Sequence, residues 1–147
     1  MKRYMRFFSL PFSKQKTILK LLFYLARAEI MISLMPYSLV RELVFRQKSL
    51  RRISSGNPYA TLQSHLSLLE KICRNLPWSF TCLRQAVALR DCLAANGVGS
   101  KLKIGLSRKK GELTAHAWLE CCNLEILKNG NYSVLTSFTT RGKKNEG

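Results

Sequence analysis

The chain of 147 residues is long enough for one domain with a hydrophobic core, and a hydrophobic content of 46% excludes an intrinsically disordered protein. Its 25 Lys and Arg against 8 Asp and Glu give a net charge of +17, which favours anionic partners: nucleic acid, an acidic peptide or protein, or an anionic membrane surface. The five cysteines form no paired framework, which argues against a disulfide-stapled secreted protein and predicts a cytoplasmic location.

Four helices are predicted before any strand, from apolar residues that recur at helical spacing. The first begins at Ser13 or Thr17 and ends near residue 35. Three charged residues interrupt its apolar run and argue against a membrane span: Lys20, Arg27 and Glu29. The other helices cover residues 37–48, 62–75 and 79–95, the last with Ser79 or Thr81 as its N-cap, and residues 54–58 form a loop.

Strands follow the helices. Alternating apolar and polar residues predict strands over residues 102–106 and 113–120, separated by a basic turn, and a third strand fits residues 124–127. Helices followed by an antiparallel sheet give the α+β class. We expect an N-terminal helical segment over residues 1–60, a core over 61–138 and a basic tail over 139–147, all within one structural unit.

Cys82 stands at the start of the fourth predicted helix, and His116 lies in the second predicted strand. The first turn of a helix offers unpaired N–H groups and a positive dipole end, which stabilise a thiolate and can bind an oxyanion. A neighbouring imidazole can act as the base. Alternation places His116 on the strand face of Thr114 and Trp118, and we expect the Cys82 helix to pack against that face. Such a pair suits acyl transfer through a cysteine acyl-enzyme.

Plainer explanations exist for the same residue types, because lone cysteines and strand histidines are more often structural than catalytic. Cys73 and Cys92 lie on apolar helix stripes and fit a core, and His65 fits a packing role. Cys121 and Cys122 are adjacent, which makes joint ligation of one tetrahedral ion difficult, so no metal site is expected.

A non-enzymatic alternative is a basic module that binds nucleic acid or an acidic partner. Its candidate contacts are Arg51-Arg52, Arg108-Lys109-Lys110 and Lys143-Lys144. The sequence contains no recognised nucleic-acid-binding signature, so solvated basic loops are the preferred explanation of these clusters.

Three blocks of the sequence resemble the transglutaminase-like leader peptidases of lasso-peptide biosynthesis, over about residues 62–135. They are Leu76-Pro77 with Thr81-Cys82-Leu83-Arg84-Gln85-Ala86 and Leu89, then Ala95-Asn96-Gly97-Val98 with Leu102-Lys103-Ile104-Gly105, then Ala115-His116-Ala117-Trp118-Leu119-Glu120. The resemblance implies a papain-like or transglutaminase-like fold and a cysteine protease. Such enzymes remove the leader from a ribosomally made precursor, so that the core peptide can be cyclised.

The resemblance also implies roles for individual residues. Cys82 would be the nucleophile and His116 the base, and Trp78 and Trp118 are the expected substrate contacts. The third residue of this family is usually an Asp that follows the His, whereas the single Asp here, Asp91, precedes it. The candidates for the third position are Asn129 or, in its place, Glu125 or Asn131.

Partners follow from the same resemblance. No three-stranded leader-binding domain is evident before residue 60, so the chain is similar to the split, stand-alone peptidases. The expected partners are a precursor peptide, a separate small leader-binding recognition protein and an ATP-dependent cyclase, with no nucleic acid and no cofactor. A transglutaminase-like acyltransferase or deamidase is the nearest enzymatic alternative, because it shares the acyl intermediate and differs in the acceptor.

Overall fold

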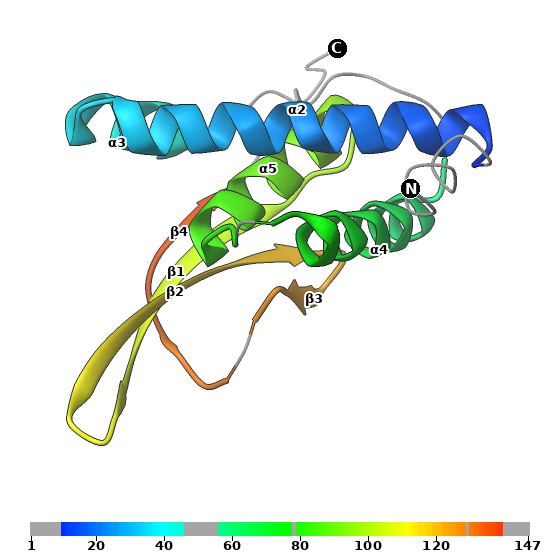
Figure 1. The fold of residues 1–147 in the computed structure, drawn as a ribbon. Helices are drawn as coiled ribbons and strands as arrows, with labels where there is room; N and C mark the ends of the chain where they lie inside the picture. The colour runs from blue at the N-terminus through cyan, green and yellow to red at the C-terminus, as the bar shows by residue number, and fades with distance from the viewer. Residues whose placement is uncertain (1–9, 46–55, 78, 129, 140–147) are drawn as a thin grey trace, which may run out of the picture.

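The computed structural model describes residues 10–45, 56–77, 79–128 and 130–139, which form four helices followed by a four-stranded antiparallel sheet (Figure 1). The helices are α2 (Phe12–Leu34), α3 (Tyr37–Phe45), α4 (Pro58–Asn75) and α5 (Cys82–Ala95). The strands are β1 (Lys101–Lys109), β2 (Glu112–Cys121), β3 (Leu124–Ile126) and β4 (Ser133–Thr139), in the spatial order β3-β2-β1-β4. The predicted α+β class is confirmed.

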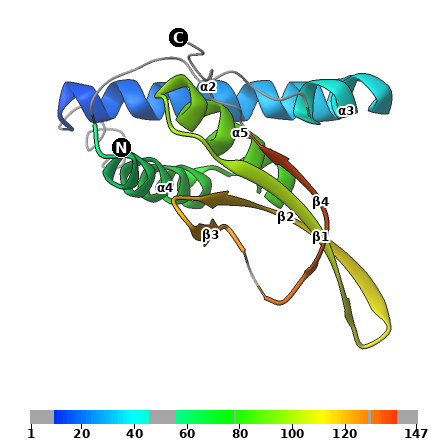
Figure 2. The same ribbon diagram turned by 180° about the vertical axis from the view of Figure 1, so that it is seen from behind.

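Helix α5 is the centre of the molecule. It runs between α2 and the sheet, with α4 alongside, as the two opposite views show (Figures 1 and 2). The stretch from Ala86 to Ala94 is buried throughout, on every side of the helix. A helix that is buried all round has to be enclosed by other elements, and here α2, α4 and the sheet enclose it. The division into segments at residues 60 and 138 stays a prediction.

The central helix carries two buried charged residues, which neutralise each other. Arg90 donates through Nε and Nη2 to Oδ1 of Asp91, each at 3.1 Å, and through Nη1 to the carbonyl oxygen of Val44 in α3. Arg27 of α2 donates to Oδ2 of Asp91 at 3.1 Å. The single Asp of the chain therefore ties α5 to α2, and its neighbouring Arg ties α5 to α3.

Local capping chemistry sets the helix starts. Helix α4 begins at Pro58 rather than at residue 62, because Asn57 acts as its N-cap and accepts from the backbone N–H of Tyr59 at 3.0 Å. Proline suits the first helical position, so the predicted loop ends sooner than expected. Thr81 occupies the N-cap position of α5 as predicted, although its side chain makes no capping hydrogen bond.

The sheet contains one strand more than predicted. β4 pairs with β1, and its register shifts between Ile104 and Gly105. The pattern missed it because Ser and Thr alternate with few apolar residues. β1 and β2 are also longer than predicted and meet in a tight turn at Lys110 and Gly111, both with positive φ. Among the described helices, none is both long and apolar enough to cross a bilayer.

Candidate active site

A cavity of about 640 Å³ lies where the start of α5 meets the β3 edge of the sheet. Residues of α4, the first turn of α5, β2 and the β3 segment line it: Leu62, Gln63, Leu66, Glu70, Cys82, Gln85, His116, Leu124, Glu125, Ile126, Leu127 and Lys128. Both residues of the predicted catalytic pair, Cys82 and His116, are among them. Two segments more than thirty positions apart in sequence therefore meet at one opening.

Cys82 is the first residue of α5, so its thiol lies beside the unpaired N–H groups of the first turn. The turn before it is held in two ways. Phe80 is buried in the core, and its carbonyl oxygen accepts from Nε2 of Gln85 at 2.8 Å. The half-buried thiol is therefore presented from a fixed helix start.

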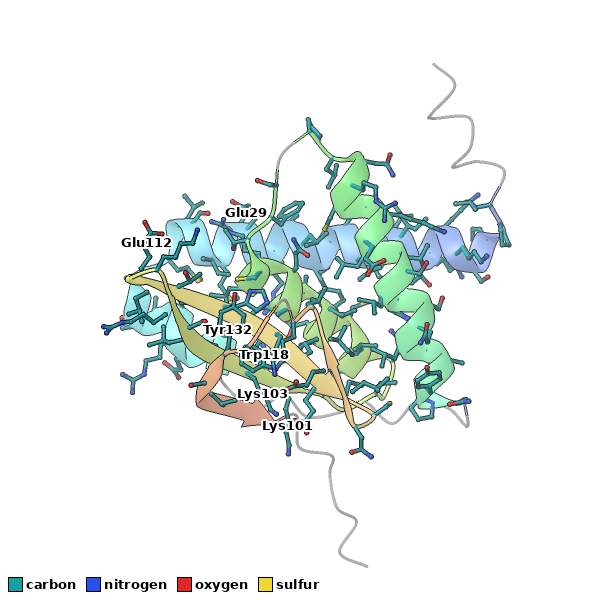
Figure 3. All side chains as sticks on the ribbon, turned by 90° about the horizontal axis from the view of Figure 1, so that it is seen from below. Glu29, Lys101, Lys103, Glu112, Trp118 and Tyr132 are labelled. Carbon is teal, nitrogen blue, oxygen red and sulfur yellow. The ribbon has the colours of Figure 1, made fainter. Side chains whose placement is uncertain are left out.

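The ring of His116 is fixed by one hydrogen bond and two aromatic neighbours. Nε2 lies 2.7 Å from the carbonyl oxygen of Leu127. Because a carbonyl only accepts, Nε2 carries the proton, and Nδ1 is the free nitrogen of the neutral ring. Tyr132 stacks at 4.9 Å between centroids and Trp118 at 6.2 Å. Figure 3 shows Trp118 and Tyr132 close together on the sheet.

The remaining described cysteines differ from Cys82 in their surroundings. Burial raises the pKa of the Cys92 thiol to about 11 and, with the adjacent Cys122, that of Cys121 to about 12. Burial also raises the pKa of Cys73. A raised pKa keeps a thiol protonated and unreactive at neutral pH. Among the described residues, Cys82 is the cysteine that lines the cavity.

The comparison with known protein families agrees with this arrangement. The profile of the transglutaminase-like superfamily matches residues 24–141, which is more than half of the chain and includes Cys82 and His116. The chain belongs to the transglutaminase-like superfamily. Members are typically cysteine-dependent enzymes, and they include cysteine proteases and acyltransferases. No curated protein and no solved structure gave a significant match.

In this transglutaminase-like chain, α5 does not pack on the strand face that was expected. Ala117 and Leu119 share one hydrophobic core with α5, whereas Trp118 is fully buried outside that core. The expectation that the Cys82 helix covers the His116 face is therefore wrong, because the apolar face of β2 is the one that a buried helix needs. The cavity instead lies at the N-terminal end of α5, beside the edge of the sheet.

The two predicted substrate contacts have different outcomes. Trp78 lies outside the described residues. Trp118 has no exposed surface, and its Nε1 donates to Oε1 of Glu125 at 3.2 Å. Its substrate contact stays a prediction that this burial argues against. Trp118 stacks on the ring of His116, and Nζ of Lys128 lies 5.1 Å from the centre of the Trp118 ring.

The candidates for the third catalytic position are only partly described. Asn129 lies outside the described residues. Glu125 lines the cavity, but its carboxylate accepts from Lys128 and from Trp118, and these bonds lower its pKa. Asn131 is exposed. Among the described residues, the main-chain carbonyl of Leu127 is the hydrogen-bond partner of His116. The sequence could not predict this partner, because every residue has a carbonyl group and its direction depends on the fold.

Proposed function

We propose that this transglutaminase-like protein is a cysteine peptidase that removes the leader from a ribosomally made lasso-peptide precursor. The observation that carries the proposal is the meeting of Cys82 and His116 in one cavity, with the thiol at a helix start. The motif resemblance points to leader removal, and the superfamily match supplies the broader class.

The reaction follows from the placement of the two groups. Nδ1 of His116 takes the proton of the Cys82 thiol, and the sulfur attacks the scissile carbonyl carbon of the precursor. Backbone N–H groups of the first turn of α5 stabilise the oxyanion of the tetrahedral intermediate. The imidazolium then gives its proton to the leaving amine as the C–N bond breaks. Water, deprotonated by Nδ1, then attacks the thioester carbonyl. As the C–S bond breaks, the imidazolium returns this proton to the sulfur of Cys82, and the leader leaves with a free carboxylate.

The cavity wall suits a peptide rather than a small polar molecule. Leu62, Leu66 and Leu124 supply an apolar part of the lining, while Glu70 and Lys128 supply opposite charges. Specific peptide sites combine apolar contact area with a few polar groups that fix orientation.

A separate leader-binding recognition protein and an ATP-dependent cyclase complete the proposal, together with the precursor and a cytoplasmic location. Support for a protein partner comes from α2, where five large apolar side chains are each more than half exposed at spacings of seven and four residues: Phe12, Leu19, Phe23, Ile30 and Leu34. Such spacing forms one stripe along the helix. Lys16 and Lys20 lie beside the stripe, so we propose an acidic surface of the recognition protein as its partner.

The test is mass spectrometry of a candidate precursor incubated with this protein and its candidate recognition protein. Wild type is compared with Cys82→Ala and His116→Ala, and Cys122→Ala serves as a matched control for an exposed cysteine. One cleavage between leader and core, lost in the first two variants and kept in the control, supports the proposal.

Two other outcomes point to the alternative functions. A mass increase of about 1 Da without chain cleavage indicates a deamidase, because water then attacks an acyl-enzyme formed from a glutamine side chain. Equal cleavage in all four proteins contradicts the peptidase. Salt-sensitive binding to nucleic acid that is unchanged in Cys82→Ala favours a basic binding module.

A further inference from the structure

We infer that the main-chain carbonyl of Leu127 is the group that orients His116 in this protein, in the place where related enzymes use an acidic side chain. The inference rests on the proposed function for its catalytic meaning, although the hydrogen bond itself is independent of it. Leu127 is thus a positioning residue that acts through His116.

A short hydrogen bond of fixed direction joins His116 to Leu127. The 2.7 Å separation between Nε2 of His116 and the oxygen of Leu127 is short for an N–H···O bond. The acceptor has no proton to give, so the bond selects the tautomer with the proton on Nε2. With Nε2 held in this way, Nδ1 is the nitrogen left to take the proton of the thiol.

The backbone conformation of Leu127 directs its carbonyl toward His116. Leu127 has a φ of +64°, in the left-handed region that a branched residue rarely adopts. Its neighbours hold it there. Ile126 is buried and pairs with Leu119 of β2, and Lys128 is bound to the carboxylate of Glu125. A left-handed residue held between two anchored neighbours is a local strain of the kind that recurs at functional sites.

Glu125, which lies on the same segment as Leu127, is already paired, and so is the single Asp of the chain. Glu125 accepts from Trp118 and Lys128, and Asp91 accepts from Arg27 and Arg90 in the core. A neutral carbonyl orients the ring but adds no negative charge. The imidazolium formed during the reaction is therefore stabilised less than it would be beside a carboxylate.

The tautomer of His116 is the first readout, measured from the imidazole nitrogens by long-range proton–nitrogen NMR on the full chain at a pH where the ring is neutral. We expect Nε2 to be protonated and Nδ1 to be free. Two variants of Leu127 separate the main chain from the side chain. Leu127→Ile keeps the volume but disfavours positive φ, whereas Leu127→Gly permits it.

We expect Leu127→Gly to keep the wild-type tautomer and Leu127→Ile to show a mixture, with the larger loss of cleavage rate in the Ile variant. The reverse order would overturn the inference, because the leucine side chain would then be the group that matters. Thermal unfolding of both variants shows whether each is folded.

A second experiment weakens the carbonyl itself. Cys122 is a natural ligation point, so residues 122–147 can be synthesised with an ester in place of the amide between Leu127 and Lys128, and joined to residues 1–121. An ester carbonyl is a poorer acceptor. Against an all-amide ligated control, we expect kcat to fall by about three- to tenfold with little change in KM.

The outcomes also separate this inference from the proposed function. Cleavage that depends on Cys82, combined with a proton on Nδ1 of His116 or with a loss of more than about a hundredfold in Asn129→Ala, overturns the inference and leaves the peptidase intact. The expected tautomer in a protein that cleaves no precursor supports the orienting bond and contradicts the peptidase.

Discussion

Gly105 of β1 lies directly opposite His116 of β2, and a methyl group added at Gly105 would collide with Trp118, which stacks on the His116 ring. A Cβ at this position lies 2.7 Å from the carbonyl oxygen of Ser133, and 2.8 Å and 2.9 Å from two ring carbons of Trp118. All three distances are shorter than real Cβ contacts, and one of the partners is main chain that cannot rotate away. We expect Gly105→Ala to cost about 1–3 kcal/mol, which lowers Tm by roughly 3–10 °C.

The collision with Trp118 can be separated from the collision with Ser133 by a double-mutant cycle. Trp118→Phe removes the outer ring carbons, so Gly105→Ala should cost at least about 1 kcal/mol less in that background than in wild type. Thermal unfolding gives the stabilities, and cleavage rates show whether a displaced Trp118 disturbs His116. An unchanged Tm in Gly105→Ala, or an equal cost in both backgrounds, would refute the close approach of Gly105 and Trp118.

Four further outcomes are expected. Burial lowers the pKa of His65 in the folded state below its usual value of 6.5, so the unfolded chain binds a proton at His65 first as the pH falls. The stability that neutral His65 contributes is therefore complete above about pH 6.5 and is lost as the pH falls toward the lower folded-state pKa. Tm should fall less between about pH 7.5 and 5.5 in His65→Gln than in wild type. Asp91→Ala leaves two arginines without their shared carboxylate and should cost about 3–5 kcal/mol in denaturant unfolding, and a cost below about 1 kcal/mol would contradict the buried network. At neutral pH, iodoacetamide should label Cys82 at least about tenfold faster than Cys92, as followed by peptide mapping; equal rates would contradict the burial of Cys92. Phe23→Glu on the exposed face of α2 should leave stability within about 0.5 kcal/mol but weaken binding of the recognition protein in calorimetry, and unchanged binding would exclude this face.

The parts of the site that depend on residue type and period were predictable from the sequence. Thr81 and Cys82 follow a proline and precede a helical repeat, which places the thiol at a helix start. Alternation along β2 places His116 and Ala117 on opposite faces, and Ala117 but not His116 belongs to the hydrophobic core. These patterns are local, because capping and side-chain alternation are set by neighbouring residues.

The parts that depend on tertiary packing were not predictable in the same way. The face of β2 that α5 covers was predicted wrongly, since alternation separates two faces but does not say which one a given helix covers. β4 was missed because its pairing with β1 is a long-range contact that compensates for a weak apolar pattern. The carbonyl that accepts from His116 is directed by the positive φ of Leu127, and leucine rarely adopts a positive φ, so the sequence does not predict it.

The β3 segment links the stability of the fold to the geometry of the site. It has three left-handed residues, Cys122, Asn123 and Leu127, around a strand of only three residues at the edge of the sheet. Burial of Ile126 against the core opposes that strain. Because edge segments open locally at lower free energy than the core, we expect the carbonyl beside His116 to be released before the helices come apart. Loosening β3 therefore removes the orientation of His116 first, so activity is more sensitive to this edge than global stability is.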